Sequence, residues 1–175
     1  MSRRLLTVAV VLAALGAAYY FLIRDTSVAP DLTTPQAVAT IGSGEDAIAV
    51  AASGAIVPWL PLPDEPGLPV LPLSEPSQSG RLAGPMLQQA RVLGAAPAAL
   101  RPYLASSYYG ESGVDVETTS GIELRFGDAS QLSKKWRSAT AVLADPSITA
   151  LDYVDLHAPG RPAIGGSGHT LPPPP

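Results

Sequence analysis

Four side chains capable of acid–base or anion-binding chemistry lie close together in the stretch TALDYVDLHAPGRPAI, residues 149–164. Asp152, Asp155, His157 and Arg161 fall within ten consecutive positions of this stretch. Aspartate beside histidine is typical of general acid–base catalysis, because histidine titrates near neutral pH. Charged residues along an exposed strand are also typical of a sheet edge that holds another protein. These two interpretations require different surrounding elements.

The segment ALDYVDLHA, residues 150–158, is predicted to form a strand, and a strand separates its polar side chains. Because side chains alternate along a strand, Asp155 and His157 share a face while Asp152 points to the other. A nucleophile would have to come from elsewhere, but the sequence has no G-x-S-x-G elbow, and Gly166–His169 imitates only part of one. Two histidines and no cysteine are too few for a histidine or thiolate metal centre. We therefore expect no catalytic residues, no metal site and no enzymatic activity.

A G-x-G-x-x-A pattern at Gly42–Ala47 suggests a dinucleotide site but lacks the required context. Such a site needs a strand before the glycines and a helix after them. The residues that follow, AIAVAASGAIV at 47–57, are rich in β-formers and interrupted by Ser53-Gly54, so they predict a short hairpin. The net charge of −4 argues against nucleic-acid binding. The sequence thus predicts no cofactor, no small-molecule substrate and no nucleic-acid partner.

The N-terminal part of the chain predicts a membrane anchor. An uncharged run extends over Leu5–Ile23, and its 19 residues as a helix span roughly 28 Å, close to the ~30 Å hydrocarbon core. Two arginines precede the run, so the positive-inside bias places residues 1–4 in the cytoplasm and residues 24–175 outside. The alternative is a cleaved signal peptide with small residues at 14–18, although the run is longer than a signal core. We expect a single-pass protein of the plasma membrane.

Composition divides the exported part into three segments. Residues 24–44 show little periodicity and are predicted to be a linker. Residues 45–164 contain both strand-type and helix-type patterns and are predicted to form one domain. The tail at 165–175, GGSGHTLPPPP, has no core-forming residues, so we expect disorder there. The domain is expected to be α/β (α+β): a small mixed, mainly antiparallel β-sheet with helices packed against it.

The clearest local prediction is a hairpin in VDVETTSGIELRFGD, residues 114–128. Opposed residues in an antiparallel pair share a face, so the alternation of apolar and polar residues indicates the loop length. A three-residue loop, Thr119-Ser120-Gly121, sets apolar residues opposite one another, with Gly121 in the left-handed conformation. The predicted register pairs Thr118 with Ile122, Val116 with Leu124, Val114 with Phe126, Asp115 with Arg125, and Glu117 with Glu123.

Two longer helices are predicted from the remaining periodicity, besides a short one that begins at Pro97. Residues 84–94 have proline at the start of a helix and glycine at its end. Asp128 is expected to cap a second helix, with Gln131 completing a capping box. Residues spaced by four, three and four positions form its apolar stripe: Leu132, Trp136, Ala139 and Leu143. The solvated face of the same helix is expected to carry Lys134, Lys135 and Arg137.

The order of the parts along the chain is itself informative. An N-terminal span is followed by IAVAASGAIVPWLPL, LPVL, Gly80-Arg81-Leu82, GIELRFGD and QLSKKWRSATAVLAD. The closing segment, Tyr153–Ala163, follows the last eleven positions of the pattern h-x-h-h-D-L-R-x-P-x-R-P-h, in which h is a hydrophobic residue, with His157 at the first arginine position. This arrangement resembles the bacterial cell-division family FtsQ/DivIB, over residues 1–24 and 45–164.

The resemblance implies a non-enzymatic divisome scaffold in septum formation. In that family the extracytoplasmic β-domain binds the FtsB–FtsL coiled-coil pair, and the partner adds to an edge of the sheet near the last strand. The implied location is the bacterial cell membrane at the division septum. The partner-binding residues expected in this sequence are Leu151, Tyr153, Asp155, His157 and Arg161.

The chain departs from the family pattern in two places. Family members carry a POTRA module after the membrane span, whereas only residues 25–44 are available here, so that module is absent or reduced to a remnant. His157 stands where the family pattern often has arginine. The alternative is a secreted or membrane-anchored envelope protein unrelated to division, which binds glycan or a small ligand.

Overall fold

The computed structural model describes residues 35–42, 44–62, 67–72 and 79–171. Within these residues the chain forms one nine-stranded sheet and two α-helices. Strand neighbours pair antiparallel in five cases and parallel in three. The prediction of an α+β domain with a mixed, mainly antiparallel sheet is therefore confirmed.

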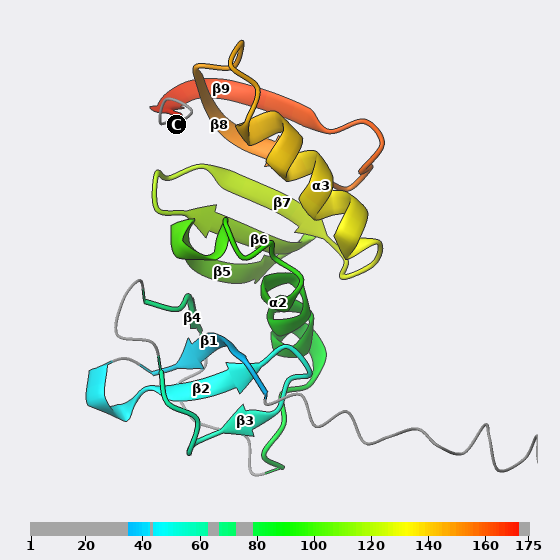
Figure 1. The fold of residues 1–175 in the computed structure, drawn as a ribbon. Coiled ribbons are helices and arrows are strands. Elements are labelled where there is room, and N and C mark those ends of the chain that lie inside the picture. Colours follow the sequence, from blue (N-terminus) through cyan, green and yellow to red (C-terminus); the bar gives the residue numbers. More distant parts are fainter. Residues whose placement is uncertain (1–34, 43, 63–66, 73–78, 172–175) are drawn as a thin grey trace, which may run out of the picture. The chain divides into compact units, whose positions relative to one another are not determined.

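The spatial order of the strands is β3-β2-β1-β4-β5-β6-β7-β8-β9. The strands β5 to β9 follow one another in both sequence and space, and β8 and β9 lie side by side in Figure 1. The strands are β1 (Ala37–Ile41), β2 (Ile48–Ala51), β3 (Ile56–Val57), β4 (Val70–Leu71), β5 (Leu104–Gly110), β6 (Gly113–Thr118), β7 (Glu123–Gly127), β8 (Ala150–Asp155) and β9 (Ala163–Thr170). Two short 3₁₀ helices, Gly44–Asp46 and Arg101–Tyr103, complete the regular elements.

The two α-helices, α2 (Gly84–Gly94) and α3 (Leu132–Leu143), cover the same face of the sheet. The helix α2 packs against β1, β5 and β6. The indole N–H of Trp136 in α3 donates to the carbonyl of Val92 in α2 at 2.9 Å, and its ring lies 4.6 Å from that of Phe126 in β7. The apolar stripe predicted for α3 is thus confirmed, because Trp136 and Ala139 are fully buried in the core.

The predicted hairpin register is confirmed for most pairs. Val116 lies opposite Leu124, Asp115 opposite Arg125, and Glu117 opposite Glu123. Gly121 takes φ 83° in the loop, which is the left-handed conformation expected of it. The predicted pairing of Val114 with Phe126 is wrong, because a register shift places Gly127 opposite Val114 instead.

The predicted linker at 24–44 is wrong in its second half, because Ala37–Ile41 forms β1. This strand lies between β2 and β4, inside the sheet. Val38, Ala39 and Ile41 are all buried. A strand covered on both sides shows no alternation of polar and apolar residues, so the sequence of β1 carries no periodic signal.

The predicted disorder of the tail is wrong for residues 165–170, which belong to β9. This strand pairs with β8 through its backbone, and its side chains are mostly exposed. Glycines allow the close approach: an added Cβ at Gly166 would lie 2.0 Å from Oδ2 of Asp152. The backbone N–H of Gly168 donates to Oδ1 of the same aspartate at 2.6 Å. A strand held in this way has few core-forming side chains, so its sequence does not indicate it.

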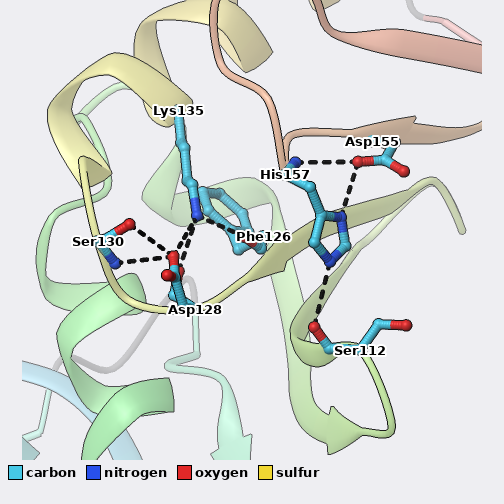
Figure 2. A network of polar contacts seen from close by, with 7 residues as sticks. All are labelled: Ser112, Phe126, Asp128, Ser130, Lys135, Asp155 and His157. Atoms are coloured by element: carbon cyan, nitrogen blue, oxygen red, sulfur yellow. Dashed lines mark hydrogen bonds and ion pairs between the residues drawn. The ribbon is translucent and has the colours of Figure 1, made fainter.

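The predicted capping box at the start of α3 is also wrong. The helix begins at Leu132, and Gln131 precedes it with φ 48° and no side-chain capping bond. Asp128 instead accepts a hydrogen bond from Nζ of Lys135 at 2.7 Å. Lys135 is 2 % exposed and also donates to the carbonyl of Phe126 at 2.7 Å, so it does not lie on the solvated face (Figure 2).

The predicted membrane span at 5–23 and the cytoplasmic residues 1–4 lie outside the described residues. In the part of the chain that the structure describes, no helix combines the length and apolar character needed to cross a bilayer.

Candidate protein-binding surface

The strand that carries most of the predicted site is an inner strand of the sheet. The strand β8 pairs parallel with β7 on one side and antiparallel with β9 on the other. The interpretation of the strand predicted at residues 150–158 as an exposed edge of the sheet is therefore wrong. The reason is the tail, whose backbone covers the side of β8 that was expected to be open. Among the strands that the structure describes, β9 is the outermost at this end of the sheet.

The five predicted partner-binding residues lie in different environments. Leu151 is 1 % exposed and belongs to the core, so a partner at the surface does not reach it. Tyr153 is half-buried, and the guanidinium of Arg125 lies 4.1 Å from the centre of its ring. Arg161 is exposed in the turn between β8 and β9, where its backbone N–H donates to the carbonyl of Ala158 at 2.8 Å. Asp155 and His157 form a separate unit.

His157 joins the end of β8 to the turn between β5 and β6. Its Nδ1 lies 2.8 Å from Oδ1 of Asp155, and its Nε2 lies 3.1 Å from the carbonyl oxygen of Ser112 (Figure 2). Its backbone N–H donates to the same aspartate oxygen at 2.9 Å. Because both ring nitrogens face acceptors, the protonated ring satisfies both contacts, and the pKa of His157 is raised by Asp155 first and by Ser112 second.

The shared face predicted for Asp155 and His157 is thus confirmed, but the pair makes structural contacts within the sheet. Burial raises the pKa of Asp155, but the hydrogen bonds from His157 outweigh it and leave that pKa lowered. Asp152 holds β9 through Gly168, away from this pair. The close spacing of acid and histidine in the sequence therefore does not produce a nucleophile–base arrangement among the described residues.

The face of β5–β8 that lies opposite the two helices carries a polar surface, which we call the open face. Two rows of directly opposed residues cross it. One row is Tyr108, Asp115, Arg125 and Asp155, and the other is Ser106, Glu117, Glu123 and Tyr153. The alternate residues Val116, Leu124 and Val154 form the core-facing row under the helices. The hairpin register predicted from the sequence includes the pairs Asp115–Arg125 and Glu117–Glu123 but does not identify them as a site.

Glu123 is the centre of the contacts on the open face. Its carboxylate accepts bonds from Nε of Arg125 at 2.7 Å and from the hydroxyl of Tyr108, and it forms an ion pair with Arg125 at 2.6 Å. Burial raises the pKa of Glu123, but the bonds from Tyr108 and Arg125 outweigh it, so the pKa is lowered overall. Burial and the Glu123 contact raise the pKa of Tyr108, which remains a neutral donor. The neighbouring Glu117 accepts a bond from the hydroxyl of Ser106 at 3.0 Å.

Asp115 differs from its neighbours because it is buried while one of its carboxylate oxygens has no hydrogen-bond donor among the described residues. It is 8 % exposed, and its Oδ1 has no hydrogen-bond partner among the described residues. Burial raises its pKa, Glu123 raises it further, and Arg125 lowers it. A buried carboxylate oxygen without a donor is costly, so its retention calls for an explanation.

In the ranges the structure describes, no three histidine, aspartate or glutamate residues group in a way that could hold a metal ion. What the domain presents is an outer strand at one end of its sheet, β9, and a charged surface beside it. These two features define the class: a small α+β domain with an outer strand at one end of its sheet and a charged open face.

A comparison with known protein families identifies the family of this chain. The family model described as "Cell division protein FtsQ/DivIB, C-terminal" matches residues 39–157, from within β1 to the end of the β8 region. The match covers more than half of the chain, and the chain belongs to the FtsQ/DivIB family, which confirms the resemblance seen in the sequence. No individual curated protein matches the chain. A role in bacterial cell division follows from the family.

Proposed function

We propose that the chain is a non-enzymatic scaffold of the divisome that binds an FtsB/FtsL-type pair through the outer edge of β9. Membership of the FtsQ/DivIB family supports the division role. The position of β9 as the outermost described strand supports the mode of binding. Under this proposal the chain is anchored by residues 5–23, with its N-terminus in the cytoplasm and the domain outside, at the division septum.

The observation that supports this proposal most directly is the outer edge of β9. An edge strand presents backbone N–H and C=O groups to a second chain, and a partner strand pairs with them in the manner of β-augmentation. The strand has the sequence AIGGSGHT, so most of its side chains are too small to hinder an approaching backbone. Ile164 is 44 % exposed and provides an apolar contact for the added strand.

The partner-binding residues predicted on β8 contact β9 on the side opposite to its outer edge. Tyr153 lies directly opposite Gly165, where an added Cβ would approach its hydroxyl oxygen to 2.7 Å. Asp152 holds the next part of β9 through Gly168. The pair Asp155 and His157, with Arg161 in the following turn, borders the strand with charge. These contacts set the position of the edge that the partner meets.

Two proline substitutions test the edge mechanism. Adjacent N–H groups along a strand point to opposite sides, so either Ala163→Pro or Ile164→Pro removes a donor from the outer edge. The other of these two substitutions removes an N–H that faces β8, so it should lower the melting temperature. The variant that loses only an N–H of the outer edge should keep its melting temperature. It should lose binding to the FtsB/FtsL-type pair of the same genome, measured with full-length chains in detergent.

Gly67→Pro is the matched control, because Gly67 lies outside the strands and an added Cβ meets nothing there within 4 Å. If both β9 variants bind as tightly as the unchanged chain, the edge mechanism is wrong. A fluorescent protein fused to the N-terminus tests the location in growing cells. A band at midcell during constriction is expected, whereas a uniform envelope signal would contradict the septal location.

A further inference from the structure

The open face holds an excess of negative charge. Four carboxylates lie within its two rows and at their ends, those of Asp115, Glu117, Glu123 and Asp155. Arg125 is the cation within the rows, and His157 lies beside Asp155. The side chains of Glu123 and Arg125 are 25 % and 39 % exposed, so the surface is accessible from solvent.

Glu117 and Glu123 lie directly opposite each other in β6 and β7. Like charges in directly opposed positions destabilise a sheet. Arg125 neutralises Glu123 from two residues further along the same strand, while Glu117 accepts its bond from the uncharged Ser106. A cation placed over this pair would remove the repulsion, so the arrangement favours a positively charged ligand.

The unsatisfied oxygen of Asp115 is a second, independent observation. Asp115 lies between Tyr108 and Arg125, its direct neighbours across the strands, so its side chain is on the open face. Its Oδ1 lacks a donor among the described residues. Arg125 does not supply one, because its guanidinium bonds to Glu123 and stacks on Tyr153. A donor supplied by a bound partner would satisfy this oxygen.

We propose that the open face binds an arginine- or lysine-rich segment of the division partner, which lies across β5–β8 beside the strand added at β9. This inference rests on the proposed function, and it specifies the chemistry of the partner surface. Tyr108 is 40 % exposed and offers a ring face for a guanidinium group, whereas the ring of Tyr153 already holds Arg125. Anionic lipid and nucleic acid are repelled by the same charge.

Charge-neutralising variants test the proposal with opposite effects on folding and binding. Glu117→Gln relieves the repulsion with Glu123, so the melting temperature should stay equal or rise. The affinity for the FtsB/FtsL-type pair should fall by up to about fivefold, the contribution of one exposed ion pair. Asp115→Asn keeps the side-chain shape and should weaken binding about tenfold or more, since it removes a desolvated carboxylate.

Affinities are measured with full-length chains from about 50 to about 400 mM salt, over which exposed charges become screened. The unchanged chain should lose affinity steadily with salt, and the two variants should lose less. Glu45→Gln is the matched control, because Glu45 is exposed in the 3₁₀ helix between β1 and β2, far along the strand order. It should behave as the unchanged chain.

The outcomes separate the two proposals. If the unchanged chain does not bind the pair, the proposed function fails. If binding is lost in the outward-facing β9 proline variant but is unchanged in Glu117→Gln and Asp115→Asn, with no dependence on salt, the charged-face inference alone is wrong. Weaker binding in the two acidic-residue variants, with Glu45→Gln unchanged, supports it.

Discussion

His157 makes two ring contacts that only its protonated form satisfies together. The acceptors are a carboxylate oxygen of Asp155 and the carbonyl of Ser112, and Lys135 opposes protonation from α3. In the family pattern this position often holds arginine, whose guanidinium is charged at every physiological pH. Histidine preserves the geometry of a doubly donating side chain but makes its charge dependent on pH.

The contribution of His157 to stability should therefore fall as pH rises. Its folded-state pKa lies above the usual value of about 6.5, so the stabilisation is fully present below that value and is lost as pH passes through the raised pKa. The lowered pKa of Asp155 keeps its carboxylate charged down to mildly acidic pH. With 42 % of the histidine side chain exposed, solvent limits the effect to within about 1 kcal/mol.

The measurement compares the unfolding free energy of the unchanged chain with that of His157→Gln at about pH 5 and about pH 8, on either side of the ordinary histidine pKa. The comparison cancels the titration of Asp115 and other groups that both chains share. The variant should be destabilised at the lower pH and nearly equal to the unchanged chain at the higher pH. An equal difference at both pH values would show that protonation of His157 has no part in the contact.

Lys135 provides a second prediction at the residue scale. Its buried ammonium donates to the carbonyls of Phe126 and Asp128 and to the carboxylate of Asp128. Lys135→Met should lower the unfolding free energy by about 1–3 kcal/mol, because acceptors at a buried site lose their donor. The carboxylate itself is 70 % exposed and regains water, which keeps the cost in this range.

The neighbouring residue supplies the control for this prediction. Lys134 is exposed, and its ammonium donates to the side chain of Gln131 at 3.2 Å. Lys134→Met should change stability by no more than about 0.5 kcal/mol, as surface substitutions generally do. Equal effects of the two variants in chemical denaturation would mean that the buried contacts of Lys135 contribute nothing.

At the scale of elements, the sequence predicts well where a strand or helix has one wet and one dry face. The β6–β7 hairpin and the stripe of α3 follow from alternation and from helical spacing, and both are confirmed. The strand β1 is covered on both sides and has no alternation to detect. The strand β9 is held by its backbone and by Asp152, so its side chains carry little information.

The same reasoning explains what was missed at the site. The strand containing Asp155 and His157 was identified correctly, but its place in the sheet depends on whether the tail pairs with it. Predicting the open face requires the pairing register of all four strands β5–β8, and local sequence patterns indicate only the register of β6 with β7. The burial of Lys135 depends on where the loop before α3 places Asp128.

Different parts of the sheet contribute to the stability of the domain and to the proposed binding of a partner. Most buried apolar residues lie between β1 and Leu156, whereas β9 contributes mainly exposed side chains. Leu171 follows β9 and packs partly against the core, with its N–H donating to the carbonyl of Thr149 at 3.0 Å. The domain therefore folds around the region before β9, and β9 adds the edge that the partner is proposed to use.

Two chains shortened only at the C-terminus test this division of roles. A chain ending at Leu171 keeps β9 and should bind the FtsB/FtsL-type pair as the unchanged chain does. A chain ending at Arg161 lacks β9 and Leu171; it should still unfold cooperatively, at a lower melting temperature because the β8–β9 ladder and the Leu171 contact are lost, and should not bind. Circular dichroism during heating and the binding assay in detergent measure the two properties. Binding by the shorter chain would show that the partner pairs with β8, and that β9 occupies in the free protein the place the partner takes in the complex.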